Sequence, residues 1–183
     1  FNHPGPVFFY TNALFEKIGT VFKLPRANSW LLSCLTVNFL FLLLMAWSIA
    51  RLFDKKLSLT ALAATLPIAV LLSSSLFNFW MPYRLILPFA VFYLSLLLVL
   101  SNGLRFLPLA MTMACILIHG YATMPIFTLP ILGLATLIEL KRNRPIRQEQ
   151  LRWLGVSVGI GALFFMPILI DFIITPHSNL RRM

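Results

Sequence analysis

Residues 30–50 read WLLSCLTVNFLFLLLMAWSIA, a stretch without any charged residue that ends at Arg51. A helix that crosses a bilayer needs about 20 mostly apolar residues, and this stretch meets that requirement. Of the 183 residues in the chain, 60% are apolar and only 11% are charged. Soluble domains carry about 25% charged residues because their surface faces water. The composition therefore excludes a soluble globular domain and predicts an all-α integral membrane protein.

Five further apolar runs follow the first one. They cover residues 57–77, 85–101, 106–121, 123–140 and 153–174. All six together predict a polytopic transmembrane helical bundle of about six spans over residues 30–174. The fourth and fifth runs are weaker, since Pro108, Pro125 and Pro130 are expected to bend or break them. They are expected to form a pair of short tilted helices or a re-entrant hairpin.

The segments on either side of the bundle, residues 1–29 and 175–183, are both predicted to be extracytoplasmic. After the turn signal Pro4-Gly5-Pro6, apolar residues recur at helical spacing from Val7 to Ile18. This run is too short to span, so it predicts an amphipathic helix lying on the membrane surface. Its polar side is expected to face water, with Glu16 as a solvated charge.

The basic residues are distributed unevenly between the loops. If the first span runs from outside to inside, the short inner loops contain nine of the fifteen Lys and Arg residues: Arg51, Lys55, Lys56, Arg105, Lys141, Arg142, Arg144, Arg147 and Arg152. The short outer loops contain Arg84 alone. Because cytoplasmic loops are enriched in Lys and Arg, we predict this orientation. It places His3, Arg84, His119 and His177 on the extracytoplasmic side.

The basic inner loops also explain the formal charge of +10, so we predict contact with membrane lipid and no nucleic-acid partner. Cys34 and Cys115 both lie in apolar runs, which predicts buried free thiols. No spacing of ligands predicts a metal site. In the last run, Gly155 and Gly159 form a GxxxG pair, which favours close helix packing inside the bundle.

Arg84 is a candidate phosphate-binding residue, because it is a cation at the outer end of a predicted span and lies next to Tyr83. An interfacial Arg that extends to lipid headgroups explains the same position. Asp171 lies near the outer end of the last run, where it can accept a hydrogen bond from a sugar hydroxyl or pair with a cation such as Arg84.

Two histidines are further candidates on the outer side. His3 lies in the Pro-rich loop, where it can bind a phosphate or a sugar, take part in proton transfer or remain solvated. His119 follows an apolar run. Polar groups near the membrane interior are costly and tend to be functional or paired, whereas a histidine at the interface costs little.

Several short segments together resemble the GT-C class of membrane glycosyltransferases, in particular the branch similar to protein O-mannosyltransferases. NHPGPVFFY at residues 2–10 looks like the family's His/Lys-Pro-Pro-Leu-aromatic-Tyr segment, with Gly-Pro in place of the second Pro-Leu. WMP at residues 80–82, His119 before a Pro-containing run and PILID at residues 167–171 add to the resemblance. The resemblance covers roughly residues 1–180.

The resemblance implies an enzyme of the bacterial plasma membrane that transfers a sugar at its extracytoplasmic face. The donor would be a polyprenyl-phosphate sugar and the acceptor a glycan, a lipid or a protein. The residues that would bind substrate are His3, Tyr10, Tyr83, Arg84, His119 and Asp171. The family's acidic catalytic residue precedes the Pro-rich segment, and here only two residues precede His3. We therefore assign no catalytic residue and expect the chain to be part of a longer enzyme.

No cofactor is assigned from the resemblance, and a divalent cation is left open. Two other classes of protein remain as alternatives. A transporter or flippase would use helices interrupted near the bilayer midplane, which the Pro-containing fourth and fifth runs would suit. A non-catalytic membrane scaffold subunit is the second alternative, and it would show neither substrate flux nor chemical turnover.

Overall fold

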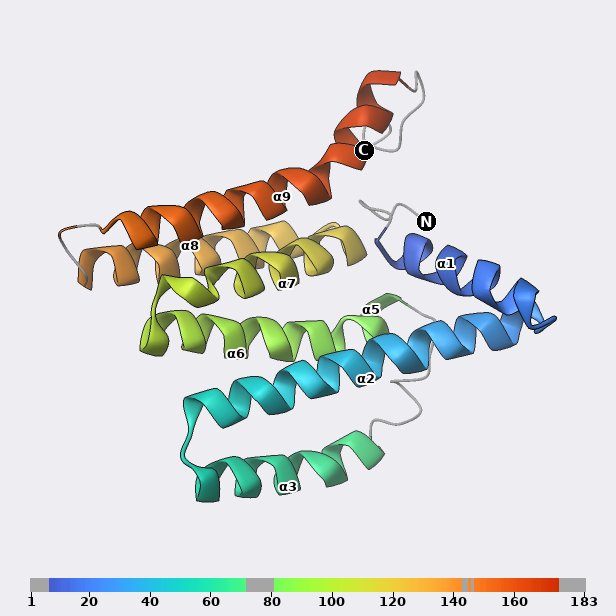
Figure 1. Cartoon of the computed structure of the whole chain (residues 1–183), viewed down its shortest axis with the longest axis horizontal. Coiled ribbons are helices and arrows are strands. Elements are labelled where there is room, and N and C mark those ends of the chain that lie inside the picture. The colour runs from blue at the N-terminus through green and yellow to red at the C-terminus, as the bar shows by residue number, and fades with distance from the viewer. Residues whose placement is uncertain (1–6, 72–80, 143–144, 146, 175–183) are drawn as a thin grey trace. The chain divides into compact units, whose positions relative to one another are not determined.

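The computed structural model describes residues 7–71, 81–142, 145 and 147–174, and every regular element within them is a helix (Figure 1). The all-α prediction is confirmed. Four helices are long and apolar enough to cross a membrane: Arg26–Leu52, Pro82–Asn102, Met124–Arg142 and Gln148–Ile170. The chain is therefore a membrane protein. Its described residues form two compact units, Val7–Val91 and the residues from Phe92 onward.

The first unit contains α1 (Val7–Val21), α2 (Arg26–Leu52), α3 (Lys55–Leu71), α5 (Met81–Arg84) and the start of α6 (Ile86–Asn102). α1 and α2 approach each other closely where Gly19 meets Ser29. A Cβ atom added to Gly19 would lie 3.0 Å from the Ser29 Cβ and closer still to its hydroxyl. Only glycine fits this contact without a shift of the neighbouring helix.

The turns of the first unit are built from local hydrogen bonds. After α1, the backbone N–H groups of Phe22 and Leu24 both donate to the Gly19 carbonyl, at 3.1 and 2.9 Å. Between α2 and α3, the Asp54 side chain accepts a hydrogen bond of 2.8 Å from the Leu57 backbone N–H. An aspartate that binds a free N–H group in the first turn is a helix N-cap. This cap explains why α3 begins directly after α2 ends.

The second unit contains the rest of α6, the 3₁₀ turn η1 (Leu104–Phe106), α7 (Leu107–Gly120), α8 (Met124–Arg142) and α9 (Gln148–Ile174). α7 packs against both α8 and α9 (Figure 1). It is the most buried helix of this unit, with buried residues over its whole length: Leu107, Ala110, Met113, Ala114, Cys115, Leu117, Ile118, His119 and Gly120. Its 14 residues span about 21 Å, short of the roughly 30 Å hydrocarbon core.

Proline does not interrupt these helices as predicted. Pro108 and Pro125 lie in the first turns of α7 and α8, where a missing N–H group costs nothing. Pro130 lies inside α8, and the helix continues through it for the full length of a span. The expectation of a broken fifth run is therefore wrong, because loss of one backbone hydrogen bond bends a long helix without ending it. Of the two helices predicted to be short, only α7 is shorter than a membrane span.

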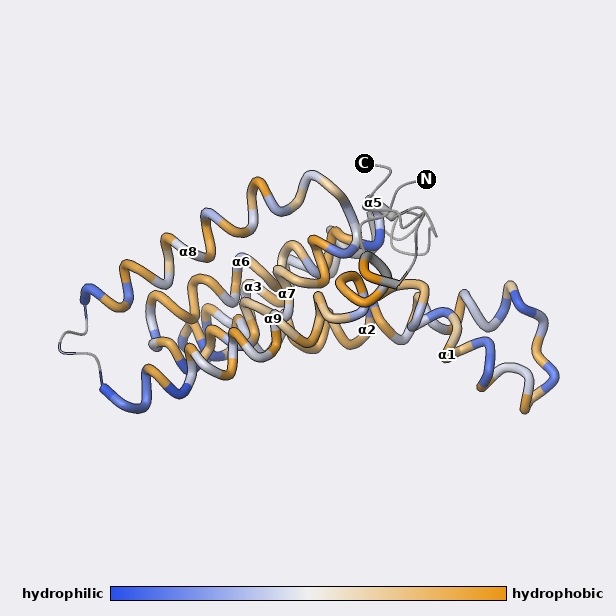
Figure 2. The backbone as a smooth tube through the Cα atoms, turned by 90° about the horizontal axis from the view of Figure 1, so that it is seen from above, coloured by the Kyte–Doolittle hydropathy of each residue, from blue (hydrophilic) through white to orange (hydrophobic). Residues whose placement is uncertain are grey.

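α9 exposes most of its apolar surface, since only 6% of its most apolar 18-residue window is buried. The strongly hydrophilic residues of α8, and those at the start of α9, gather at the ends joined by the connection after Arg142 (Figure 2). A Cβ added to Gly155 or Gly159 would meet no atom within 4 Å, so the predicted GxxxG packing inside the bundle is wrong. α9 contacts α7 through another face, where a Cβ added to Gly161 would lie 3.7 Å from the Met111 sulfur.

Candidate functional site

Arg84 is the centre of a polar cluster in the first unit. It is the last residue of α5 and only 3% exposed. Its guanidinium is buried in this structure and does not extend outward toward lipid headgroups. Instead, Arg84 Nη1 donates to the Asn12 side-chain oxygen at 3.3 Å. This contact joins α5 to α1, across 72 residues of sequence.

A second donor binds the same oxygen of Asn12. The Ser33 hydroxyl of α2 donates to Asn12 Oδ1 at 3.0 Å, and Ser33 is completely buried. A side-chain amide oxygen has two lone pairs, so it accepts both hydrogen bonds. Asn12 thus links α1, α2 and α5 through one atom and fixes the position of the Arg84 guanidinium.

The guanidinium also lies over an aromatic ring. The Arg84 Cζ is 4.6 Å from the centroid of the Phe8 ring, within the range of a cation–π interaction, and Phe8 is itself buried. Arg84 Nη2 is buried without a hydrogen-bond partner among the described residues, and none of their carboxylates pairs with Arg84. Removing a charge from water is costly unless it is compensated, so this guanidinium is suited to bind an anion.

α1 turns Asn12 and Glu16 toward α2, whereas Lys17 is exposed. Phe8, Asn12 and Gly19 lie on one face of α1 and contact α2 or Arg84, whereas Tyr10, Leu14 and Ile18 on another face are exposed. The sequence predicted the reverse for the polar side of this helix. The helix itself is confirmed, and its exposed face is apolar, as is required of a helix that lies against lipid.

The same face of α1 contains Glu16, which keeps a partly exposed side chain, as expected of a solvated charge, and also has partners on α2. Glu16 Oε1 accepts a hydrogen bond of 2.6 Å from Arg26 Nε and another from the Trp30 indole N–H. Arg26 also lies over the Trp30 ring, 4.8 Å from its centroid. The hydrogen bond from Arg26, followed by that from Trp30, lowers the pKa of the Glu16 carboxyl below its ordinary value of 4.5.

His119 belongs to the second unit and is 1% exposed at the end of α7. Its imidazole packs edge-on against two aromatic rings of α9, with centroid distances of 5.7 Å to Phe164 and 5.4 Å to Phe165. Neither ring nitrogen has a hydrogen-bond partner among the described residues. His119 is therefore enclosed by aromatic side chains.

The remaining predicted residues are Tyr10, Tyr83, His3 and Asp171. Tyr10 is 59% exposed, on the face of α1 that points away from α2, and Tyr83 is half-buried directly before Arg84. His3 lies outside the described residues. Asp171 lies within α9, and its side chain is outside the described part of the structure. Arg84 and His119 occupy different units, and each is described within its own.

Three residues of this cluster were missed by sequence reasoning: Phe8 and Asn12, which contact Arg84, and Ser33, which binds Asn12. The first span contained a usable signal, because Ser29 and Ser33 are buried polar residues one helical turn apart on one face of α2. Small and polar residues in an apolar helix mark the side that packs against other helices. That stripe would have indicated where α2 meets a polar partner.

The described residues contain no group of three or more His, Cys, Asp or Glu side chains arranged to hold a metal ion. No family model, curated protein or solved structure matches the chain.

Proposed function

We propose that the chain forms part of an integral membrane glycosyltransferase that uses a polyprenyl-phosphate sugar at the extracytoplasmic face of a bacterial plasma membrane. The observation that carries the proposal is the Arg84 guanidinium, buried beside Asn12 and Phe8 with Nη2 unpartnered among the described residues. A cation in this setting suits a lipid-linked phosphate, since guanidinium binds phosphate oxygens through two parallel N–H groups.

The proposed reaction assigns Arg84 one role. The acceptor hydroxyl attacks the anomeric carbon of the donor sugar, and the bond from that carbon to the phosphate oxygen breaks. Negative charge then develops on the leaving polyprenyl phosphate. Arg84 stabilises this charge, while Asn12 and Phe8 hold the guanidinium in place, so that little reorganisation is needed during the reaction. The proton of the acceptor hydroxyl goes to a general base.

The first test is turnover by the purified protein in proteoliposomes, with a panel of polyprenyl-phosphate hexoses and pentoses and release of polyprenyl phosphate as the readout. We expect Arg84→Gln to lower kcat by about 10²- to 10³-fold, the usual effect of removing one donor that stabilises developing charge. Arg84→Lys should retain an intermediate rate, because it keeps the charge and loses the planar pair of donors.

The matched control is Lys17→Gln, which removes an exposed cation from α1 and should leave turnover unchanged. Thermal unfolding of each variant separates loss of function from loss of fold. A folded Arg84→Gln protein with wild-type turnover would overturn the role of Arg84. Movement of the donor lipid between leaflets without release of polyprenyl phosphate would favour a flippase and overturn the enzyme assignment.

A further inference from the structure

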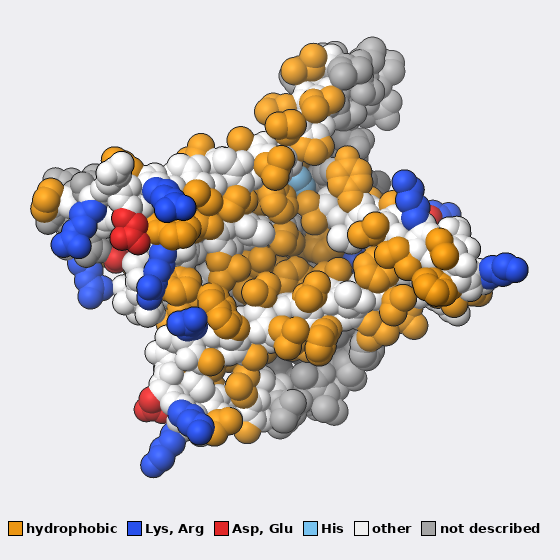
Figure 3. Space-filling model, in the orientation of Figure 1, with side chains coloured by type: hydrophobic (Ala, Val, Ile, Leu, Met, Phe, Trp, Pro, Cys, Tyr) orange, Lys and Arg blue, Asp and Glu red, His pale blue; other side chains and the backbone are white. Residues whose placement is uncertain are grey.

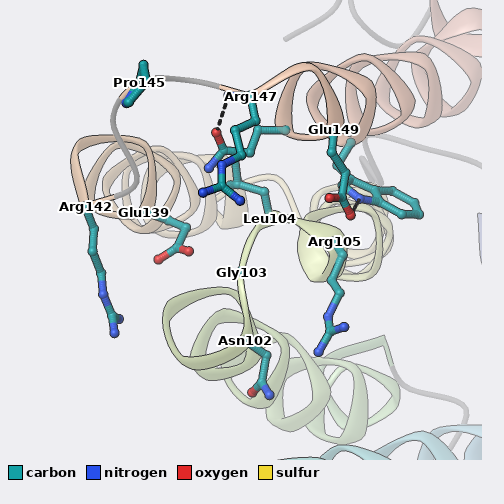
Figure 4. Close-up of a pocket in the computed structure, with 11 residues that line it drawn as sticks. Asn102, Gly103, Leu104, Arg105, Glu139, Arg142, Pro145, Arg147 and Glu149 are labelled. Atoms are coloured by element: carbon teal, nitrogen blue, oxygen red, sulfur yellow. Dashed lines mark hydrogen bonds between the residues drawn. The ribbon is translucent and has the colours of Figure 1, made fainter.

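The second unit contains a polar cavity at the end where η1 meets the connection from α8 to α9. Its volume is about 600 Å³, within the usual range for ligand sites. Side chains from η1, α8 and the start of α9 line it, as Figure 4 shows around Gly103. The cavity also confirms that the segments around Arg105 and Arg142 lie at the same end of this unit, as the predicted topology requires.

Three arginines line this cavity: Arg105, Arg142 and Arg147. None of them forms an ion pair with a described residue. Glu139 and Glu149 are the carboxylates of the lining, so its formal charge is three minus two, or +1. Cationic side chains gather around acidic ones over this end of the second unit in Figure 3. The cavity thus offers cations for a phosphate, and carboxylates that can accept hydrogen bonds from hydroxyl groups.

An apolar groove lies between α6 and α8 in the same unit. Its volume is about 250 Å³, and its lining is entirely aromatic and aliphatic: Tyr93, Leu96, Leu97, Leu100, Ile131, Leu134, Ala135 and Ile138. From Tyr93 to Leu100 the helix rises about 10 Å. The groove is therefore long enough for part of an acyl chain and contains no charge to repel it.

The groove and the cavity are adjacent along both helices. On α8, Ile131, Ala135, Ile138 and Arg142 follow one another at spacings of four, three and four residues, which places them on one face. Arg142 lines the cavity and its Nη1 donates to the carbonyl of Leu100, which lines the groove, at 2.9 Å. An amphipathic ligand can therefore occupy both spaces.

We propose that the cavity and the groove together bind one anionic phospholipid with a hydroxylated headgroup. The phosphate lies among the three arginines, the headgroup hydroxyls donate to the Glu139 and Glu149 carboxylates, and one acyl chain lies in the groove. Basic pockets between membrane helices on the cytoplasmic side are suited to anionic headgroups. The predicted orientation places this end of the unit on that side, opposite to Arg84, so this site is distinct from the proposed sugar-transfer site.

Native mass spectrometry of the purified chain with added phosphatidylglycerol tests the proposal. We expect Arg142→Gln combined with Arg147→Gln to weaken binding by about 25-fold, at about fivefold for each cation. The matched control is Lys141→Gln, an exposed neighbour outside the cavity lining, which should bind as the wild type does. Phosphatidylcholine, with a phosphate but neither net charge nor hydroxyls, should bind more weakly than phosphatidylglycerol. Equal loss in the control and the double variant would overturn the site.

Two further experiments use only the wild-type chain. The first determines whether the bound phosphate belongs to a lipid or to a soluble compound, and the second locates the acyl chain. Inorganic phosphate or glycerol phosphate at millimolar concentration should not displace the lipid; displacement by either would replace the lipid assignment with a soluble phosphate. Phosphatidylglycerol with a photoreactive acyl chain should label residues 93–100 or 131–138 of the wild-type chain. Labelling confined to other residues would overturn the placement of the chain in the groove.

Discussion

Single atoms on polar side chains hold the first unit together. Asn12 Oδ1 accepts from Ser33 and Arg84, and Glu16 Oε1 accepts from Arg26 and Trp30. Each oxygen thereby connects α1 to another element. Only the Glu16 acceptor can lose its charge by protonation, because the Asn12 amide does not titrate, so the Glu16 contact is the more sensitive to pH.

Protonation of Glu16 should loosen the contact between α1 and α2. The pKa of Glu16 is lowered in the folded protein, so its contribution to stability is fully present above its ordinary pKa of 4.5 and is lost as pH falls through the lower folded value. We expect thermal unfolding of the wild type to move to lower temperature below about pH 4.5, and Glu16→Gln to lack this part of the pH dependence. The chain has only five acidic residues.

The matched control for this measurement is Glu149→Gln, which removes a carboxylate from the second unit and leaves the Arg26 contact intact. Its unfolding temperature should keep the wild-type dependence on pH. If Glu16→Gln and the wild type lose stability in parallel below pH 4.5, the Glu16–Arg26 pair does not contribute to it.

The candidate site shows which features of single residues can be predicted from sequence. Arg84 was identifiable because it is the one cation in the short outer loops of the predicted topology. Its partner Asn12 was not, since 72 residues separate the two and nothing local to either residue specifies their contact. The burial of His119 between Phe164 and Phe165 depends in the same way on how α7 packs against α9.

At the scale of elements, the orientation of α1 is the main departure from expectation. In a soluble protein a polar face points to water, but lipid reverses this preference, since buried polar groups then find partners inside the protein. α1 follows the second pattern: Asn12 and Glu16 bind α2 or Arg84, while Tyr10, Leu14 and Ile18 are exposed.

The exposed face of α1 should contact lipid in a reconstituted membrane. A nitroxide at Leu14, in the middle of the apolar face, should relax more strongly with dissolved oxygen, which concentrates in lipid. A nitroxide at Lys17, an exposed position with a polar side chain, should relax more strongly with a water-soluble nickel reagent. Equal access of the nickel reagent to both positions would contradict a membrane-surface position for α1.

Helix positions followed closely from hydropathy, because a bilayer leaves an uncharged run of about 20 residues little alternative to a helix. The runs at residues 85–101 and 123–140 became α6 (Ile86–Asn102) and α8 (Met124–Arg142). The predicted run at residues 57–77 extends beyond the described part of α3. The number of spans did not follow from hydropathy alone, since α7 is helical but short. Its burial against α8 and α9 depends on how the helices pack, which hydropathy does not specify.

At the scale of the whole molecule, orientation in the membrane stays a prediction that follows from the distribution of Lys and Arg. The second unit supplies two positions at opposite ends of its helices. Tyr121 follows the end of α7 and is exposed, and Glu149 lies in the first turn of α9. The proposed enzyme requires the Tyr121 end to be extracytoplasmic.

Cysteine labelling in intact cells measures this orientation. Tyr121→Cys should react with a membrane-impermeant maleimide, and Glu149→Cys should react only after the membrane is permeabilised. The native Cys34 and Cys115 are both buried, which keeps the background low. A variant without either introduced cysteine is the control. Labelling of Glu149→Cys but not Tyr121→Cys in intact cells would invert the topology and remove the proposed donor site from the outer face.

The brevity of α7 has a consequence for biosynthesis. A 14-residue helix offers the insertion machinery too little apolar length to be retained in the bilayer as a separate segment. α8, which follows after only Tyr121–Thr123, has the length that α7 lacks. We therefore expect α7 and α8 to leave the translocon together as a helical hairpin. Insertion of α7 then depends on α8, which is synthesised directly after it.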